Sequence, residues 1–129
     1  MLDTNMLSDV VRRPRGSVGR HLRRVGERSV VVSIMAVAEA KFGAAKSPAR
    51  GLGVQLESVL ARIEIVPFDA PADQRYAELR AHLQRAGTPI GANDLWIAAH
   101  ALALDCTLVT DNEREFRRVP GLRVENWLA

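Results

Sequence analysis

The sequence is short of cysteine, lysine, aromatic residues and long apolar runs. Its one cysteine, Cys106, excludes an internal disulfide and a cysteine-rich zinc site. Aromatic residues make up 5% of the chain, too few for a nucleic-acid platform built mainly on base stacking. The longest nearly unbroken apolar run, 95–104, contains His100 and is far shorter than the roughly 18 residues that cross a bilayer. Asp3 stands where a signal peptide would carry its basic region. We therefore expect a soluble cytoplasmic protein with no membrane segment.

What the chain does contain is the residue balance of one globular domain. It has 129 residues, of which 47% are apolar and 26% are charged, and we expect a single domain over residues 1–129. The formal net charge is +3, and every basic residue except Lys41 and Lys46 is an arginine. The planar guanidinium suits phosphate, so this bias favours a phosphate-rich partner, although coding at high GC content also enriches arginine.

Short β-rich runs alternate with amphipathic helical stretches along the chain. The β-rich runs are 30–32, 63–66 and 107–110, with shorter candidates at 1–3 and 122–124. The helical stretches are 5–13, 34–45, 52–61, 72–86 and 93–104, with Ser33 as an N-cap of the second and Gly87 closing the fourth. Apolar strands separated by helices predict an α/β fold with a parallel sheet covered on both faces. The ligand site of such a sheet lies beyond the carboxyl ends of its strands.

Four acidic residues stand at positions where an acid needs an explanation. Asp3 ends the first candidate strand and Asp111 directly follows the fourth, so both belong to the expected carboxyl edge. Glu39 and Asp94 lie on apolar helix faces, where a carboxylate is costly without positive charge or hydrogen-bond donors. We expect these carboxylates to gather around Mg²⁺ or Mn²⁺, hard cations that prefer oxygen ligands. The competing interpretation makes Asp3 and Asp94 helix N-terminal acids and Glu39 a solvated side chain.

Four motifs follow one another around these acids. They are LDTNMLS at 2–8, SIMAVAEAKFG at 33–43, IGANDLWIAA at 90–99 and TLVTDNEREF at 107–116. With a short closing strand that ends in Asn126 and Trp127, they resemble the motifs of PIN-domain ribonucleases, specifically the VapC-like toxins of type II toxin–antitoxin modules. The resemblance covers essentially the whole chain. It implies a PIN-like three-layer α/β/α sandwich with a central, mainly parallel sheet of four to five strands.

The resemblance also implies roles for individual residues. Asp3, Glu39 and Asp94 match the three acids that the family uses to hold Mg²⁺ or Mn²⁺. Thr4 matches a hydroxyl position bordering that site, and Asn5 matches a residue that orients the first aspartate.

The fourth acid of the family's site is left open by this sequence. The family places it either two residues after the last threonine of the fourth motif, where this chain has Asn112, or just before the phenylalanine, where it has Glu115. Asp111 is an additional acid one position before Asn112. We favour Glu115, with Asp111 as the substitute. Ala36 stands where relatives often have threonine, so one hydroxyl near the site is missing.

A group of arginines near the N-terminus forms the candidate RNA-binding surface. Its members are Arg12, Arg13, Arg15, Arg20, Arg23 and Arg24, with Arg28 close behind. They predict a rim that positions RNA by its phosphates, and the competing interpretation is the solvated face of a helix. The three histidines lack the spacing of a zinc site or a nucleophile–base pair, and we interpret them as structural or surface residues.

The resemblance implies a metal-dependent endoribonuclease toxin restrained by a cognate antitoxin, in a homodimer or a toxin–antitoxin hetero-oligomer. One alternative keeps the fold but loses catalysis, leaving a module that binds RNA or the antitoxin. Another is a phosphotransferase with Asp3 as its nucleophile, which we disfavour because Asn5 occupies the place of the second aspartate that this class needs.

Overall fold

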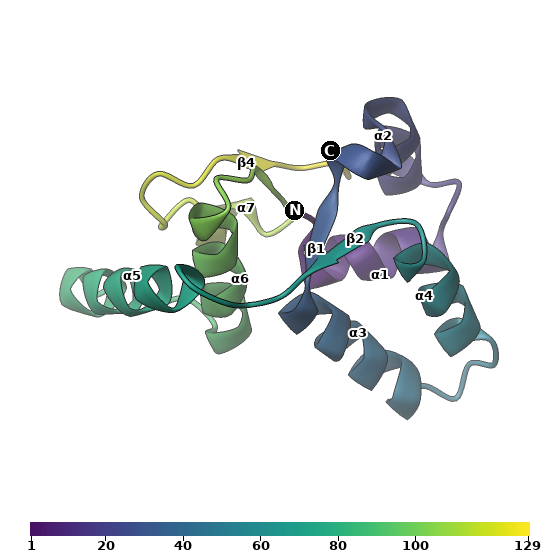
Figure 1. Ribbon diagram of the computed structural model, residues 1–129, viewed down its shortest axis with the longest axis horizontal. Helices are drawn as coiled ribbons and strands as arrows, with labels where there is room; N and C mark the ends of the chain where they lie inside the picture. Colours follow the sequence, from purple (N-terminus) through teal and green to yellow (C-terminus); the bar gives the residue numbers. More distant parts are fainter.

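A computed structural model describes all residues, 1–129, as helices arranged around short strands (Figure 1). The helices are α1 (Thr4–Arg12), α2 (Ser17–Val25), α3 (Ile34–Lys46), α4 (Leu52–Leu60), α5 (Ala72–Ala86), α6 (Ala92–Ala103) and α7 (Glu113–Phe116), with a 3₁₀ helix η1 (Glu27–Ser29). The strands are β1 (Val31–Ser33), β2 (Glu64–Val66), β3 (Leu108–Val109) and β4 (Val124–Glu125). The predicted order of elements is confirmed, although no bounds were predicted for α2 and α7.

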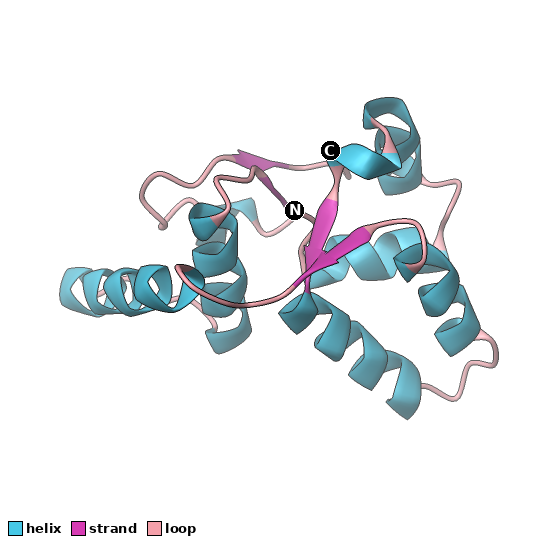
Figure 2. Cartoon of the chain, in the orientation of Figure 1, coloured by secondary structure: helices cyan, strands magenta, loops and turns pink.

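Parallel strand pairs form the centre of the molecule (Figure 2). β1 pairs with β2, which places Val32 beside Ile65, and β3 pairs with β4. Leu2 joins the two pairs because it forms parallel bridges with both Val32 and Val109. The predicted parallel pairing is confirmed. The regular strands, however, form two two-stranded pieces instead of one continuous sheet of four to five strands.

The N-terminal segment contributes only one bridging position because a helix begins directly after it. Asp3 is the N-cap of α1, with φ −77° and ψ 178°, and its carboxylate accepts a hydrogen bond of 2.8 Å from the N–H of Met6. The N–H of Asp3 still bonds to the carbonyl of Val109 at 3.0 Å. The chain therefore leaves the sheet at Asp3 and holds this side chain at the carboxyl edge.

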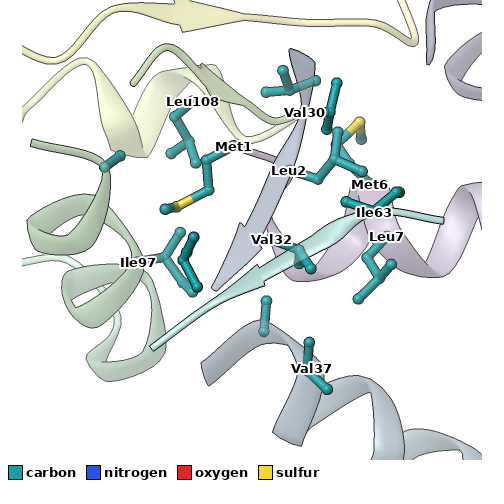
Figure 3. Packing of buried hydrophobic residues seen from close by; sticks show 14 of the residues in the cluster. Met1, Leu2, Met6, Leu7, Val30, Val32, Val37, Ile63, Ile97 and Leu108 are labelled. Carbon is teal, nitrogen blue, oxygen red and sulfur yellow. The ribbon is translucent and has the colours of Figure 1, made fainter. Parts of the chain in front are cut away.

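Helices flank the strands on two sides (Figure 1). On one side α1, α3 and α4 contact one another, and on the other α5 packs along α6. Between these groups the buried core surrounds Leu2, which is fully buried with Val32, Ile97 and Leu108 (Figure 3). β1 and β3 are largely buried and apolar, as expected of strands that are covered on both faces, whereas β2 and β4 include the exposed residues Glu64 and Glu125.

The ends of the helices follow local chemistry that the sequence already indicates. Ser33 caps α3, and its hydroxyl accepts a hydrogen bond of 3.1 Å from the N–H of Met35. α5 has the predicted bounds and ends at Gly87, whose φ of 68° is left-handed. No helix combines the length and the apolar character that a membrane span requires.

Candidate active site

Asp3 lies at the point where the chain leaves the sheet, and it is only 4% exposed. Burial raises the pKa of its carboxyl group. Hydrogen bonds from the hydroxyl of Thr110, at the end of β3, and from the N–H groups of Met6 and Asn5 act in the opposite direction. The charge of Asp111 raises the pKa of Asp3 further. Asp3 is therefore a rigidly held carboxylate in a site with little water.

Asp94 lies in the first turn of α6 and is partly buried. Burial raises the pKa of Asp94 to about 7, with contributions from hydrogen bonding to Glu115 and from the negative charges of Glu115 and Asp3. The side-chain amide of Asn112 donates a hydrogen bond to Asp94 Oδ2 at 3.3 Å and lowers this pKa in part. The structure thus brings Asp94 into electrostatic contact with two other acids from distant parts of the chain.

Glu115 in α7 completes this group of acids. Burial alone would raise the pKa of Glu115, but hydrogen bonds from the N–H of Gly91, from Asp94 and from the amide of Asn112 hold the pKa below its usual value. The positive charge of Arg118 acts in the same direction. Glu115 is consequently the charged partner of the pair, and Asp94 is the one that holds a proton more readily.

Asn112, which follows β3 and caps α7, holds the two acids together. Its side-chain amide donates to both Asp94 and Glu115, and its own N–H bonds to the hydroxyl of Thr110 at 2.9 Å. Thr110 in turn bonds to Asp3, so one short segment connects all three acids. We define the acid cluster as Asp3, Asp94 and Glu115 together with Asn112, the amide residue that joins the last two.

The remaining predicted site residues lie less centrally. Glu39 on α3 is partly buried, and no hydrogen bond or ion pair links its side chain to the acid cluster. Asp111 is exposed and acts on Asp3 through its charge. Thr4 is partly exposed at the start of α1. Asn5 contacts Asp3 through its backbone N–H, while its side chain is exposed.

Several hydrogen-bonding groups that fix the acid cluster were not among the predicted site residues. Thr110 and the N–H of Gly91 bond to the acids directly, and Arg118 holds the loop that carries Gly91 by donating to the carbonyl of Pro89 at 2.8 Å. The position of Gly91 just before α6 was a usable signal, because a helix N-terminus offers free N–H groups to an anion.

His100 is buried on α6, consistent with the structural role expected for it. It is 2% exposed, and its Nδ1 lies 2.8 Å from the hydroxyl of Ser33. Burial lowers the pKa of the His100 imidazole, opposed by a hydrogen bond to the backbone of Pro67 and by the charge of Asp69. The ring also meets Phe68 edge to face. His100 thereby ties α6, which carries Asp94, to β1 and to the segment after β2.

The arginines of the candidate RNA-binding surface are all exposed, and their hydrogen bonds and ion pairs join residues close in sequence. Arg13 pairs with Asp9, Arg23 donates to the carbonyl of Pro14, and Arg24 contacts His21. None of them forms an ion pair with an acid of the cluster.

The donor chemistry of the acid cluster fits a hard divalent cation. Its side chains offer oxygen ligands, and neither Asp3 nor Asp94 forms an ion pair with lysine, arginine or histidine. The negative charges of Glu115 and Asp3 contribute to the raised pKa of Asp94, because like charges disfavour a further ionised carboxylate. A cation would relieve that repulsion. No group of three or more acids lies at metal-binding distance in this structure.

Comparison with known proteins identifies the family of the chain. The profile of the PIN domain family matches residues 1–122. Ribonuclease VapC2 of Rickettsia felis is 38% identical over 129 residues, covering 98% of this chain and 96% of the relative. The tRNA(fMet)-specific endonuclease VapC of Shigella flexneri shows the same identity and coverage.

Solved structures show the same likeness in three dimensions. The crystal structure of VapBC2 from Rickettsia felis, bound to a DNA fragment from its promoter, contains a chain that superposes with a TM-score of 0.91. The two chains are 37% identical, and the match covers 98% of this chain and 97% of the other. The chain therefore belongs to the PIN domain family, within its VapC group of ribonuclease toxins.

Proposed function

We propose that this protein is a metal-dependent endoribonuclease toxin that hydrolyses RNA phosphodiester bonds with Mg²⁺ or Mn²⁺ held by its acids. Asp3, Glu39 and Asp94 are the proposed metal ligands, and Glu115 is the fourth acid. The observation that carries the proposal is the gathering of Asp94 and Glu115 on the amide of Asn112, near the buried Asp3, with no ion pair between Asp3 or Asp94 and a basic residue.

The side chains prepare the site in distinct ways. When bound, the cation supplies Lewis acidity toward water and the phosphate oxygens. Asp3 is held in place by the N–H of Met6 and the hydroxyl of Thr110. Asn112 keeps the carboxyl groups of Asp94 and Glu115 side by side. The family resemblance implies 5′-phosphate and 3′-hydroxyl ends.

Initiator transfer RNA is the first substrate to test, because the Shigella flexneri relative carries its name. Purified protein freed of antitoxin is incubated with this RNA in Mg²⁺, in Mn²⁺ and in EDTA, beside Asp94→Asn. Asp73→Asn is the matched control, because Asp73 lies in the first turn of α5 but outside the acid cluster.

We expect cleavage by the parent and by Asp73→Asn with either metal, none in EDTA, and a loss of at least a hundredfold in Asp94→Asn. Cleavage by folded Asp94→Asn at the parental rate would contradict the assignment. A folded parent that binds RNA but cuts neither this nor other structured RNA would favour the non-catalytic binding module instead.

The partner proposal follows from the same charges. Solved relatives form VapBC toxin–antitoxin complexes. We propose a cognate antitoxin for this chain as well, with an arginine inserted among the carboxylates in place of the metal, and assembly as a homodimer or hetero-oligomer.

We also infer that the fold is a three-layer α/β/α sandwich, in which Leu2 links both strand pairs into one central sheet.

A further inference from the structure

A cavity of 230 Å³ lies between α5 and the start of α6, outside the acid cluster. Its lining includes Tyr76, Arg80 and Gln84 on α5, Ile90 in the connecting loop, and Ala92 at the start of α6. Clefts for drug-sized ligands measure roughly 300–1,000 Å³, so this one suits a single ring system.

The cavity and the acid cluster share one wall, the loop of residues 89–91. The N–H of Gly91 in this loop bonds to Glu115, while the neighbouring Ile90 lines the cavity. The carbonyl of Pro89 accepts a hydrogen bond from Arg118. α7 therefore fixes this loop from the acidic side, and a ligand in the cavity would lie beside the acid cluster.

The lining combines an apolar interior with a polar rim. Leu83 and Leu95 are buried and contribute apolar surface, whereas Arg80 and Gln84 are exposed. The guanidinium of Arg80 donates to the hydroxyl of Tyr76 at 3.1 Å. The ring of Tyr76 is stacked on the ring of Trp96 on α6, with 3.7 Å between the ring centroids. This side of the cavity is consequently preorganised.

We propose that this cavity binds one base of the RNA, from a nucleotide adjacent to the cleaved phosphodiester, with Arg80 and Gln84 reading the base edge. A base has apolar faces that suit the leucines and hydrogen-bonding edges that suit a guanidinium and an amide. Proteins recognise single-stranded RNA through such splayed bases. The proposal rests on the ribonuclease function and adds the site that selects where the RNA is cut.

The test uses the double variant Arg80→Ala/Gln84→Ala, with Arg85→Ala as the control. All three residues are exposed on α5, and Arg85 does not line the cavity. The first readout is the base composition around the cuts in a randomised RNA pool with Mg²⁺ or Mn²⁺. We expect the parent and Arg85→Ala to prefer one base about fivefold or more at a position flanking the cut. In the double variant the preference should fall below about twofold, since each lost hydrogen bond is equivalent to about 1 kcal/mol.

The second readout does not depend on cleavage. A mixed-sequence oligoribonucleotide is added to the metal-free protein, and backbone amide shifts are followed by NMR. Shifts at residues 76–84 and 89–92 that weaken only in the double variant would support the proposal, even if no cleavage were seen and the proposed function failed. Cleavage without base preference, a preference unchanged in the double variant, or shifts confined to other surfaces would overturn the base site and leave the ribonuclease intact. A change of oligomeric state in the double variant alone would also overturn it, because the cavity would then be a contact between protein chains.

Discussion

The carboxyl group of Asp94 is held beside two other acids, and this arrangement costs stability when no cation is present. We expect Asp94→Asn to raise the melting temperature of the metal-free protein at pH 8 by a few degrees, because the amide removes like-charge repulsion and keeps an acceptor for Asn112. Thermal unfolding in EDTA measures the effect, with Asp73→Asn as the control. A lower melting temperature in Asp94→Asn would show that the acids do not repel one another in the folded protein.

His100 gives a second prediction for a single residue, and this one concerns acid stability. Burial lowers its pKa in the folded protein, so the unfolded chain binds a proton first as the pH falls. The stability that the neutral imidazole contributes is therefore present above its unfolded pKa, ~6.5, and is lost as the pH falls through the lowered folded pKa.

Urea unfolding at pH 7 and pH 5 measures this contribution. We expect His100→Asn to reduce the loss of unfolding free energy between the two pH values, even if it destabilises the protein at both. His82→Asn should leave the loss unchanged, because His82 is exposed. An equal loss in His100→Asn and the parent would assign the acid sensitivity to other groups.

At the scale of elements, Ser33 serves two partners at once, the N-terminus of α3 and the ring of His100. Ser33→Ala should lower the free energy of unfolding by about 2 kcal/mol, because it removes a helix cap and leaves a buried imidazole nitrogen without its partner. Urea denaturation is the measurement. Ser58→Ala, on the exposed face of α4, should change stability by less than about 0.5 kcal/mol. A similar small change in Ser33→Ala would mean that α3 does not need this cap.

These elements also show which parts of the structure are readable from sequence. The Ser33 cap and the bounds of α5 depend on a few neighbouring residues, and both were predicted. The contact of Glu115 with Gly91 depends on how α7 packs against the start of α6, which no local pattern encodes. Glu39 stays a prediction from its place on an apolar helix face, because no hydrogen bond or ion pair fixes the position of its side chain relative to the other acids.

The whole molecule has a net charge of +3, although it contains an acid cluster, because it also carries many exposed arginines. We expect these arginines to supply the contacts with RNA phosphates. We expect the triple variant Arg15→Gln/Arg20→Gln/Arg24→Gln to weaken binding of initiator transfer RNA and to reduce the slope of log affinity against log salt by about two, at ~0.7 per phosphate contact. Filter binding in EDTA between 50 and 200 mM KCl gives the slope. Proteins that make many phosphate contacts lose ~10³-fold or more in affinity over this range, so the change is measurable.

The matched control removes the same charge elsewhere, with Arg50, Arg62 and Arg75 changed to glutamine. These residues are exposed, and the surface ion pairs of Arg62 and Arg75 contribute little to stability. If the N-terminal arginines form the RNA-binding rim, only the first triple variant lowers the slope by about two. If both triple variants lower it equally, the arginines act through net charge alone. In that case the N-terminal arginines are a solvated surface and do not set the position of the RNA.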